Sequence, residues 1–173
     1  MKKYELTSNF KMCSGKKIFQ IRALVNLKNG VKVGELGGWI EKEENLSHIG
    51  DAWVSGNAKI IGDACVTDNA WVRDNAWVTG DAWVRDNAWV TGKAHVAGNA
   101  WVSKIADLLQ ITGLGTVHRT TTVYRTKNGI EITCGCFCGN LEQFREQVVK
   151  TREGKVRDEY LKFAELIEIY FRL

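Results

Sequence analysis

A six-residue motif is repeated nine times without insertion between residues 50 and 103. Each copy reads Gly or Asp, then a residue that is mostly Asn or Asp, then Ala, a variable residue, Val or Ile, and a last residue. A fixed short period is the signature of a solenoid, in which each repeat packs against its neighbours. The copies begin at Gly50, Gly56, Gly62, Asp68, Asp74, Gly80, Asp86, Gly92 and Gly98.

The order of residue types in the motif predicts a short strand followed by a corner. In Ala-x-Val, the alternation of a strand directs Ala and Val to the inner side and the variable residue to the outer side. Gly, Asn and Asp tolerate the positive φ of a tight corner, and Lys93 is the one poor fit at these sites. Three hexads make a triangular coil of eighteen residues, so the repeat predicts three coils of a parallel β-helix stacked at about 4.8 Å.

The variable residues are expected to form outward ladders, because positions eighteen residues apart lie above one another in the stack. Six of these nine residues are tryptophan. The ladders are Trp53, Trp71 and Trp89; Lys59, Trp77 and His95; and Cys65, Trp83 and Trp101. The first ladder is unbroken in tryptophan and is therefore the first candidate for a contact surface.

Exposed tryptophan on this scale needs a covering partner, since each side chain carries about 150–250 Å² of surface. One interpretation is packing against sister subunits or against the C-terminal part of the chain. The other is a binding surface on which a flat ligand such as a nucleobase stacks, with its phosphates near arginine or lysine. The candidate ligand or interface residues are Trp53, Trp71, Trp89, Trp77, Trp83, Trp101, Arg73, Arg85 and Lys59.

Both flanks of the repeat differ from it in composition. Residues 1–49 contain two apolar strand-like runs, 18–21 and 23–25, and are expected to form a β cap over the open end of the solenoid. Residues 104–173 predict a small α+β module. Its expected elements are a hairpin of strands 117–126 and 130–137 with an Asn-Gly turn, a helix capped by Asn140 with Gln143 three residues on, and a second helix from Arg157 to about Phe171.

The Gly-Asn/Asp-Ala-x-Val hexads resemble the hexapeptide-repeat, left-handed β-helix superfamily, and this resemblance implies left-handed coils and favours a trimer. With the entry segment Gly-Gly-Trp39-Ile40-Glu-Lys-Glu-Glu-Asn-Leu46-Ser47, residues 1–103 resemble a group of bacterial and phage proteins that carries a transferase label. The C-terminal module is similar to tails of phage-borne members. The resemblance implies a phage or prophage accessory protein that counters host defence by binding a host protein or a small nucleotide-type ligand.

His95 is the single histidine of the repeat and the alternative catalytic candidate. Acyltransferases of the superfamily use such a histidine at a subunit interface to deprotonate an acceptor, with acetyl-coenzyme A as the donor. The chain departs from those enzymes because no loop is extruded between its hexads to build a coenzyme A pocket. His95 also occupies a slot that elsewhere holds Trp, Lys or Cys. We therefore expect a binding protein without cofactor, with the acyltransferase as the alternative.

A metal site is not expected from the histidines and cysteines. His48, His95 and His118 lie before, within and after the repeat, so the sequence gives no reason for them to converge. Cys134, Cys136 and Cys138 alternate along one predicted strand and lack Cys-x-x-Cys spacing, which favours small packed residues over zinc ligands.

Charge and cysteine usage restrict the partners. The chain has 24 Lys and Arg against 20 Asp and Glu, a net charge of +4 that is too mild to indicate nucleic-acid binding. No apolar stretch reaches membrane-spanning length, and no apolar signal segment follows the N-terminal lysines. Five cysteines make a poor disulfide framework. We expect a cytoplasmic homo-oligomer, in a bacterium or an infected host cell, without membrane contact.

Overall fold

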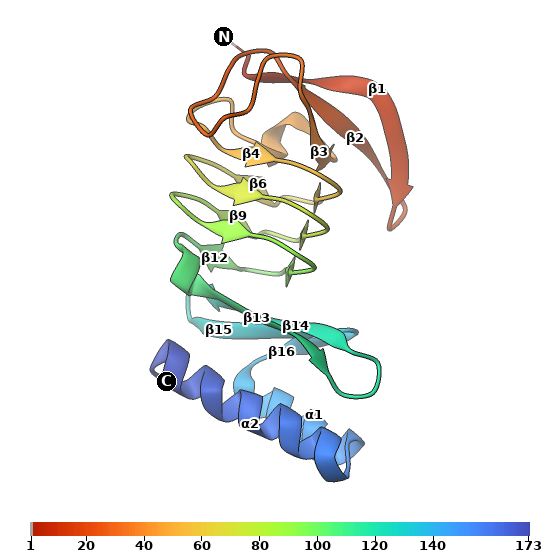
Figure 1. The fold of residues 1–173 in the computed structure, drawn as a ribbon, viewed down its shortest axis with the longest axis vertical. Coiled ribbons are helices and arrows are strands. Elements are labelled where there is room, and N and C mark those ends of the chain that lie inside the picture. Colours follow the sequence, from red (N-terminus) through yellow and green to blue (C-terminus); the bar gives the residue numbers. More distant parts are fainter. Residues whose placement is uncertain (1) are drawn as a thin grey trace.

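The computed structural model describes residues 2–173 as an elongated stack. A hairpin lies at the N-terminal end, coils follow, and a sheet covered by two helices closes the other end (Figure 1). The N-terminal strands are β1 (Tyr4–Cys13), β2 (Lys16–Ala23) and β3 (Leu36–Ile40). Within residues 2–173, no helix has the length and apolar character needed to span a membrane.

Each hexad contributes one two-residue strand to the solenoid, as the repeat predicts. Partners in parallel register are eighteen residues apart, such as Trp53 with Trp71 and Trp71 with Trp89. The strands are β4 (Trp53–Val54), β5 (Lys59–Ile60), β6 (Cys65–Val66), β7 (Trp71–Val72), β8 (Trp77–Val78), β9 (Trp83–Val84), β10 (Trp89–Val90), β11 (His95–Val96) and β12 (Trp101–Val102). They form three faces, β4-β7-β10, β6-β9-β12 and β5-β8-β11.

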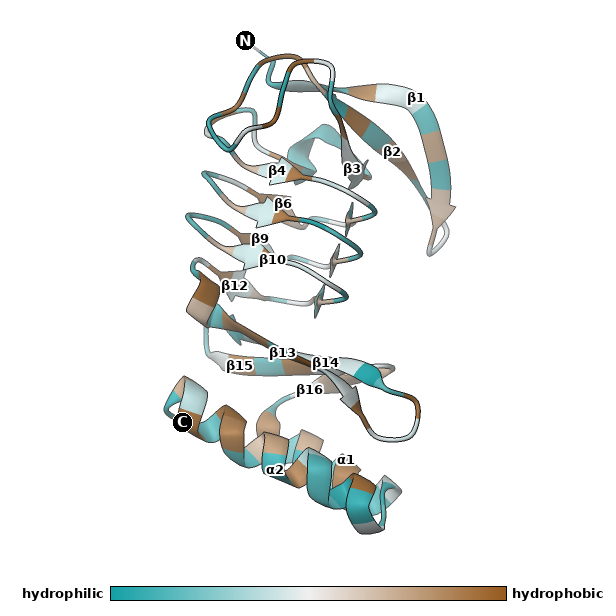
Figure 2. Ribbon diagram, in the orientation of Figure 1, coloured by the Kyte–Doolittle hydropathy of each residue, from teal (hydrophilic) through white to brown (hydrophobic). Residues whose placement is uncertain are grey.

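The first residue of every hexad has a positive φ, between 54° and 79°. Aspartate tolerates this left-handed conformation better than most residues, because its short side chain can bond to nearby backbone groups. The Asp74 carboxylate accepts the Gly92 N–H of the next coil at 2.9 Å, and Asp68 accepts the Asp86 N–H at 3.3 Å. Gly and Asp thus fulfil the corner role that the sequence predicts for them. Figure 2 shows hydrophilic residues along the corners between the strands.

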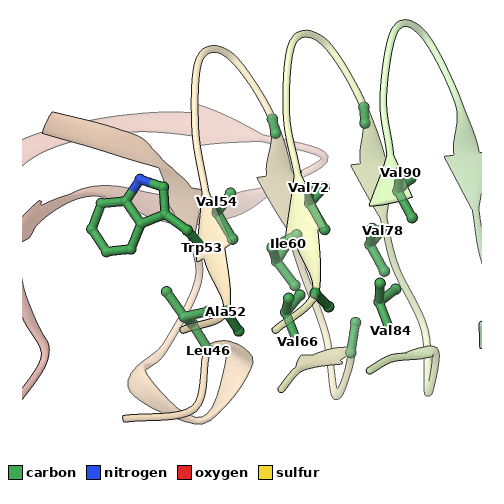
Figure 3. Packing of buried hydrophobic residues seen from close by; sticks show 14 of the residues in the cluster. Leu46, Ala52, Trp53, Val54, Ile60, Val66, Val72, Val78, Val84 and Val90 are labelled. Carbon is green, nitrogen blue, oxygen red and sulfur yellow. The ribbon is translucent and has the colours of Figure 1, made fainter. Parts of the chain in front are cut away.

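The inner wall of the solenoid consists of the Ala and Val or Ile columns. The alanine at the third position and the Val or Ile at the fifth position of every hexad are buried, with exposed fractions of 0% or 1%. Figure 3 shows how Leu46, Val54, Ile60 and the valines after them line up along the axis. The narrow interior therefore holds one aliphatic side chain per face and coil, and small alanines between them.

The segment predicted as a cap also adds strands to the solenoid, which reaches about four turns. β3 pairs in parallel with β5 through Trp39–Lys59 and Ile40–Ile60, and Leu46 bridges Val66. Gly38 stands where the hexads have Ala, and a Cβ there would lie 2.7 Å from Val54 Cγ1. Solenoid pairing thus begins before the first recognisable hexad at residue 50.

The N-terminal hairpin closes the first coil. β1 and β2 are antiparallel and extend the β5-β8-β11 face in the order β1-β2-β3-β5-β8-β11. The buried Lys3 ammonium donates to the Ala52 carbonyl at 2.8 Å, so it satisfies an oxygen at the open end of the stack. Burial lowers the pKa of Lys3 to about 8, and Asp51 opposes that shift.

The C-terminal module packs on the last coil and carries two helices on its far side (Figure 1). Its sheet, in the order β13-β14-β15-β16, has Tyr124 in the solenoid core, whereas Val123 and Ile132 belong to the core shared with the helices. The predicted hairpin and capping box are both present, with Asn140 Oδ1 accepting the Gln143 N–H at 2.9 Å. The elements are β13 (Leu108–Leu114), β14 (Arg119–Thr126), β15 (Gly129–Cys134), β16 (Phe137–Gly139), α1 (Leu141–Thr151) and α2 (Gly154–Phe171), with two short 3-10 turns, Glu43–Asn45 and Ile105–Asp107, elsewhere in the chain.

Candidate functional site

The first ladder is covered at one end by the chain itself. Trp53 has an exposed fraction of 0%, and Tyr4 of β1 packs edge-on against it with 6.4 Å between ring centroids. Trp71 and Trp89 meet at 74° rather than face to face, and the Arg73 guanidinium lies 5.7 Å and 5.3 Å from their centroids. The ladder is therefore a packed cation-aromatic surface, in which Trp53 offers no area to a partner.

The second ladder is a stack of cations and rings. It begins one turn earlier than the hexads indicate, because Trp39 lies over Lys59, and Lys59 Nζ lies 5.2 Å from the Trp77 ring centroid. His95 stacks on Trp77 at 5.3 Å and 26°. Burial lowers the pKa of His95, and its Nε2 lies 3.5 Å from Thr79 Oγ1. Within residues 2–173 no carboxylate bonds the imidazole, so the orienting partner of a general base is not found beside it.

The third ladder forms the flattest aromatic surface of the solenoid. Trp83 and Trp101 stack with 5.6 Å between centroids and only 11° between ring planes. Trp83 has an exposed fraction of 42%. The Arg85 guanidinium and the Lys127 ammonium each lie 5.2 Å from the Trp101 centroid. Two tryptophans and two cations thus share one surface, and one of the cations comes from the C-terminal module.

A hollow of about 540 Å³, the Trp83 groove, separates this ladder from the C-terminal module. It exists because the Ala100–Thr126 bridge fixes the end of β14 beside β12, which places the β14–β15 turn next to the tryptophans. Trp83 and Trp101 form its aromatic wall. Its polar lining includes Asp81, Asn99, Lys127, Glu131, Asn140 and Gln143.

The groove presents both donors and acceptors. The capping box uses Asn140 Oδ1 and Gln143 Oε1, and within the described chain no partner bonds their two NH₂ groups. The Glu131 carboxylate is positioned by two hydrogen bonds within the module, because it accepts the Tyr124 hydroxyl at 3.2 Å and the Cys138 thiol at 3.3 Å. An aromatic wall opposite mixed donors and acceptors suits a flat ligand with a polar edge.

The sequence identifies one half of this groove. Trp83 and Trp101 are predicted site residues, whereas Lys127 and the polar lining from the module are not. The Asn-Gly dipeptide predicts a turn at 127–129 and the capping box predicts a helix start at Asn140, but neither signal says that these termini face the solenoid. That placement depends on Tyr124 entering the core of the last coil.

The histidines and cysteines are dispersed. His48 stacks on Tyr4 at 4.4 Å, His95 lies on the second ladder, and His118 contacts the Gly113 carbonyl at 3.0 Å. The five cysteines are free thiols. Over the described range, residues 2–173, no three metal-ligating side chains gather at one point.

The fold and the groove define a class, a parallel β-solenoid of about four turns with an appended two-helix module. No protein-family model matches the sequence, and no curated protein matches it.

Proposed function

We propose that this chain is a non-catalytic binding protein whose Trp83 groove takes a small nucleotide-type ligand. The observation that carries the proposal is the near-parallel Trp83–Trp101 pair, 5.6 Å apart, on the wall of a 540 Å³ hollow. Nucleobases stack on tryptophan because both present flat π surfaces, and each such stack contributes about 1–3 kcal/mol.

The polar lining supports a nucleobase over a purely apolar ring. The edge of a base alternates donors and acceptors within its plane; the Asn99 amide can match both, and the NH₂ group of Gln143 adds a donor. Asp81 adds an acceptor at the same wall. A base stacked on Trp83 would therefore find partners around its rim.

The cations support a phosphate on the same ligand. Lys127 and Arg85 both lie over the Trp101 ring, beside the wall on which the base would stack. Arg85 is paired with Asp86 at 2.9 Å, so Lys127 is the main candidate for the phosphate. Asp81 and Glu131 limit how much negative charge the groove accepts. We therefore propose a ligand with few phosphates, such as a mononucleotide or a cyclic nucleotide.

Titration calorimetry and tryptophan fluorescence with a panel of mono-, di- and cyclic nucleotides test the proposal. Trp83→Ala is expected to weaken binding about 5- to 150-fold, the equivalent of one lost stack. Trp89→Ala is the matched control, because Trp89 is equally exposed at 42% on a different face. Absence of binding across the panel, or equal losses in the two variants, would remove the proposal.

The wider role rests on the resemblance of residues 1–103 to hexapeptide-repeat proteins of bacteria and phages. On that basis we propose left-handed coils, of which three are regular, and a cytoplasmic phage or prophage protein that counters host defence by sequestering the nucleotide. Binding a host protein at the same surface is the other form of this role. Protection of an infecting phage that is lost in Trp83→Ala but kept in Trp89→Ala would support it.

Homo-oligomerisation, with a trimer favoured by the superfamily, belongs to the same proposal. Support comes from α2, where Leu166, Ile169 and Tyr170 are exposed at 45%, 75% and 40% with helical spacing. Solution mass from light scattering tests it, and a monomer at high concentration would contradict it.

A further inference from the structure

Arg119 and Arg152 of the C-terminal module line a hollow and have no salt-bridge partner among the described residues, and Arg125, Arg157 and Arg172 also have none but do not line that hollow. Arg119 begins β14 and Arg152 is the C-cap of α1. Across residues 2–173, no carboxylate lies within salt-bridge distance of either guanidinium, whereas Arg22, Arg85 and Arg145 each have such a partner. Unpaired cations in a hollow indicate affinity for an anion more strongly than paired ones on an open surface.

Both arginines line the same concave region beside the loop between β13 and β14. Two hollows of about 130 and 280 Å³ share four lining residues, which are Arg119, Thr151, Arg152 and Tyr160. We call this region the two-arginine hollow. It lies at the Arg119 end of β14, whereas the Trp83 groove lies at the Thr126 end.

Arg119, Arg152 and Tyr160 lie together where the two hollows meet. Arg119 lies against Gly135, where a Cβ would be 2.8 Å from Arg119 Nη1, and Gly135 has φ +61°. The Arg152 N–H bonds the Val148 carbonyl at 2.9 Å and ends α1. Burial and the Cys134 thiol raise the pKa of Tyr160, while Arg152 and Arg119 oppose the rise, as cations close to the phenol must.

The charge of the hollow is not compensated from inside. No carboxylate lines the smaller hollow, and Glu153 alone lines the larger one. The nearby Glu159 accepts the Gly115 N–H at 3.1 Å and lies 3.7 Å from Lys155. Two positive charges are therefore opposed by one exposed carboxylate.

The floor of the smaller hollow is aromatic. Phe144 lies 5.5 Å from Phe137 and 6.0 Å from Tyr160, measured between ring centroids, and Val148 completes the apolar side. The arginines favour an anion, and the aromatic floor favours an apolar group that displaces water from it. A ligand that combines a strong anion with a small apolar body therefore matches the hollow best.

We propose that the two-arginine hollow binds a phosphate monoester through Arg119 and Arg152, with the organic group of the ester against Phe137 and Phe144. The planar guanidinium matches two phosphate oxygens at once, and two guanidinium groups balance the two charges of the ester. The Tyr160 hydroxyl, which donates to the Leu114 carbonyl at 3.4 Å, lies at the boundary of the two hollows and offers its oxygen as an acceptor. The site is independent of the nucleotide groove proposed above.

Phenyl phosphate is the probe, with inorganic phosphate, benzoate and phenol as comparisons in calorimetry on the full chain. Phenyl phosphate is expected to bind most tightly, phosphate and benzoate more weakly, and phenol not to bind. Arg119→Gln and Arg152→Gln should each weaken binding roughly tenfold or more. Lys150→Gln removes a neighbouring charge that does not line the hollow and should leave the affinity unchanged.

Measurement in the Trp83→Ala background separates this site from the groove, because the phenyl phosphate affinity should persist there. Arg152→Lys, which keeps the charge and loses the fork, should give an intermediate affinity in a chain with unchanged melting temperature. The proposal is overturned by no heat at about 1 mM phenyl phosphate, by phenol binding as tightly as its phosphate, or by equal losses in Lys150→Gln and the arginine variants.

Discussion

His95 shows how one repeat position changes chemistry with its surroundings. The slot holds tryptophan in most hexads, and His95 takes the same stacked geometry on Trp77, with its backbone N–H bonded to Thr122 Oγ1 at 3.1 Å and its carbonyl accepting from Thr133 at 2.6 Å. The His95 imidazole is therefore packed like the tryptophans of the neighbouring repeats, half-buried and stacked on a ring. Its lowered pKa follows from burial and requires no catalytic role.

Stability should fall on acidification partly because of this residue. A histidine whose folded pKa lies below its ordinary value of about 6.5 favours folding above that value, and this contribution is lost as the pH falls from there through the folded pKa. The slope cannot exceed about 1.4 kcal/mol per pH unit for each such group. His95→Gln should therefore flatten the dependence of unfolding free energy on pH between about 7 and 5, as measured by urea denaturation.

His48 also has a pKa lowered by burial, so it provides the comparison for that experiment. His48→Gln should remove a further part of the slope, and the double variant should remove both parts. An unchanged slope in His95→Gln would show that His95 titrates as it does in the unfolded chain.

At the scale of the element, each coil depends on a corner that most residues cannot adopt. Asp74 has φ +65° and its carboxylate bonds the next coil, whereas Asn75 beside it is also exposed and has no positive φ. Asp74→Val is expected to destabilise the chain by about 1–3 kcal/mol, because a β-branched residue is strained there and the inter-coil bond is lost. Chemical denaturation measures this loss.

Asn75→Val is the matched control for the corner. It places the same side chain one position later, at an exposed site with ordinary φ, and should change stability by about 0.5 kcal/mol or less. Equal effects at the two positions would mean that hydrophobic exposure, not backbone conformation, governs the corner.

The sequence predicts well the strands of the hexad repeat, because the repeat length determines which strands pair. The register of the coils follows from a spacing of eighteen residues, and the corner and core columns follow from single positions in the hexad. β3 escapes prediction because Gly38 replaces the signature alanine and the segment after it does not continue the hexads, although Trp39 and Ile40 keep the outward and core positions. The sequence also does not predict the burial of Trp53 or the Trp83 groove. Both depend on contacts with the non-repeated N-terminal and C-terminal segments, which the repeat pattern does not encode.

At the scale of the whole molecule, Tyr124 joins the module to the solenoid. Its ring is completely buried in the solenoid core, while the neighbouring Val123 belongs to the module core. Tyr124→Ala should cost about 3–5 kcal/mol, as large aromatic truncations do, and should split a single calorimetric unfolding transition into two. Tyr124→Phe keeps the ring and should keep one transition. A single transition in Tyr124→Ala would show that other contacts couple the two parts.

The two ends of the stack are closed in different ways, one by a hairpin with the Lys3 ammonium and the other by a sheet that inserts Tyr124. A bare solenoid end is a template onto which another copy can add its strands, and repeated addition gives fibres. Closure at both ends leaves side-chain surfaces, such as the lateral faces and the exposed face of α2, as the places where copies can meet. An assembly of this chain is therefore expected to be finite, with the number of subunits set by rotation about an axis rather than by concentration.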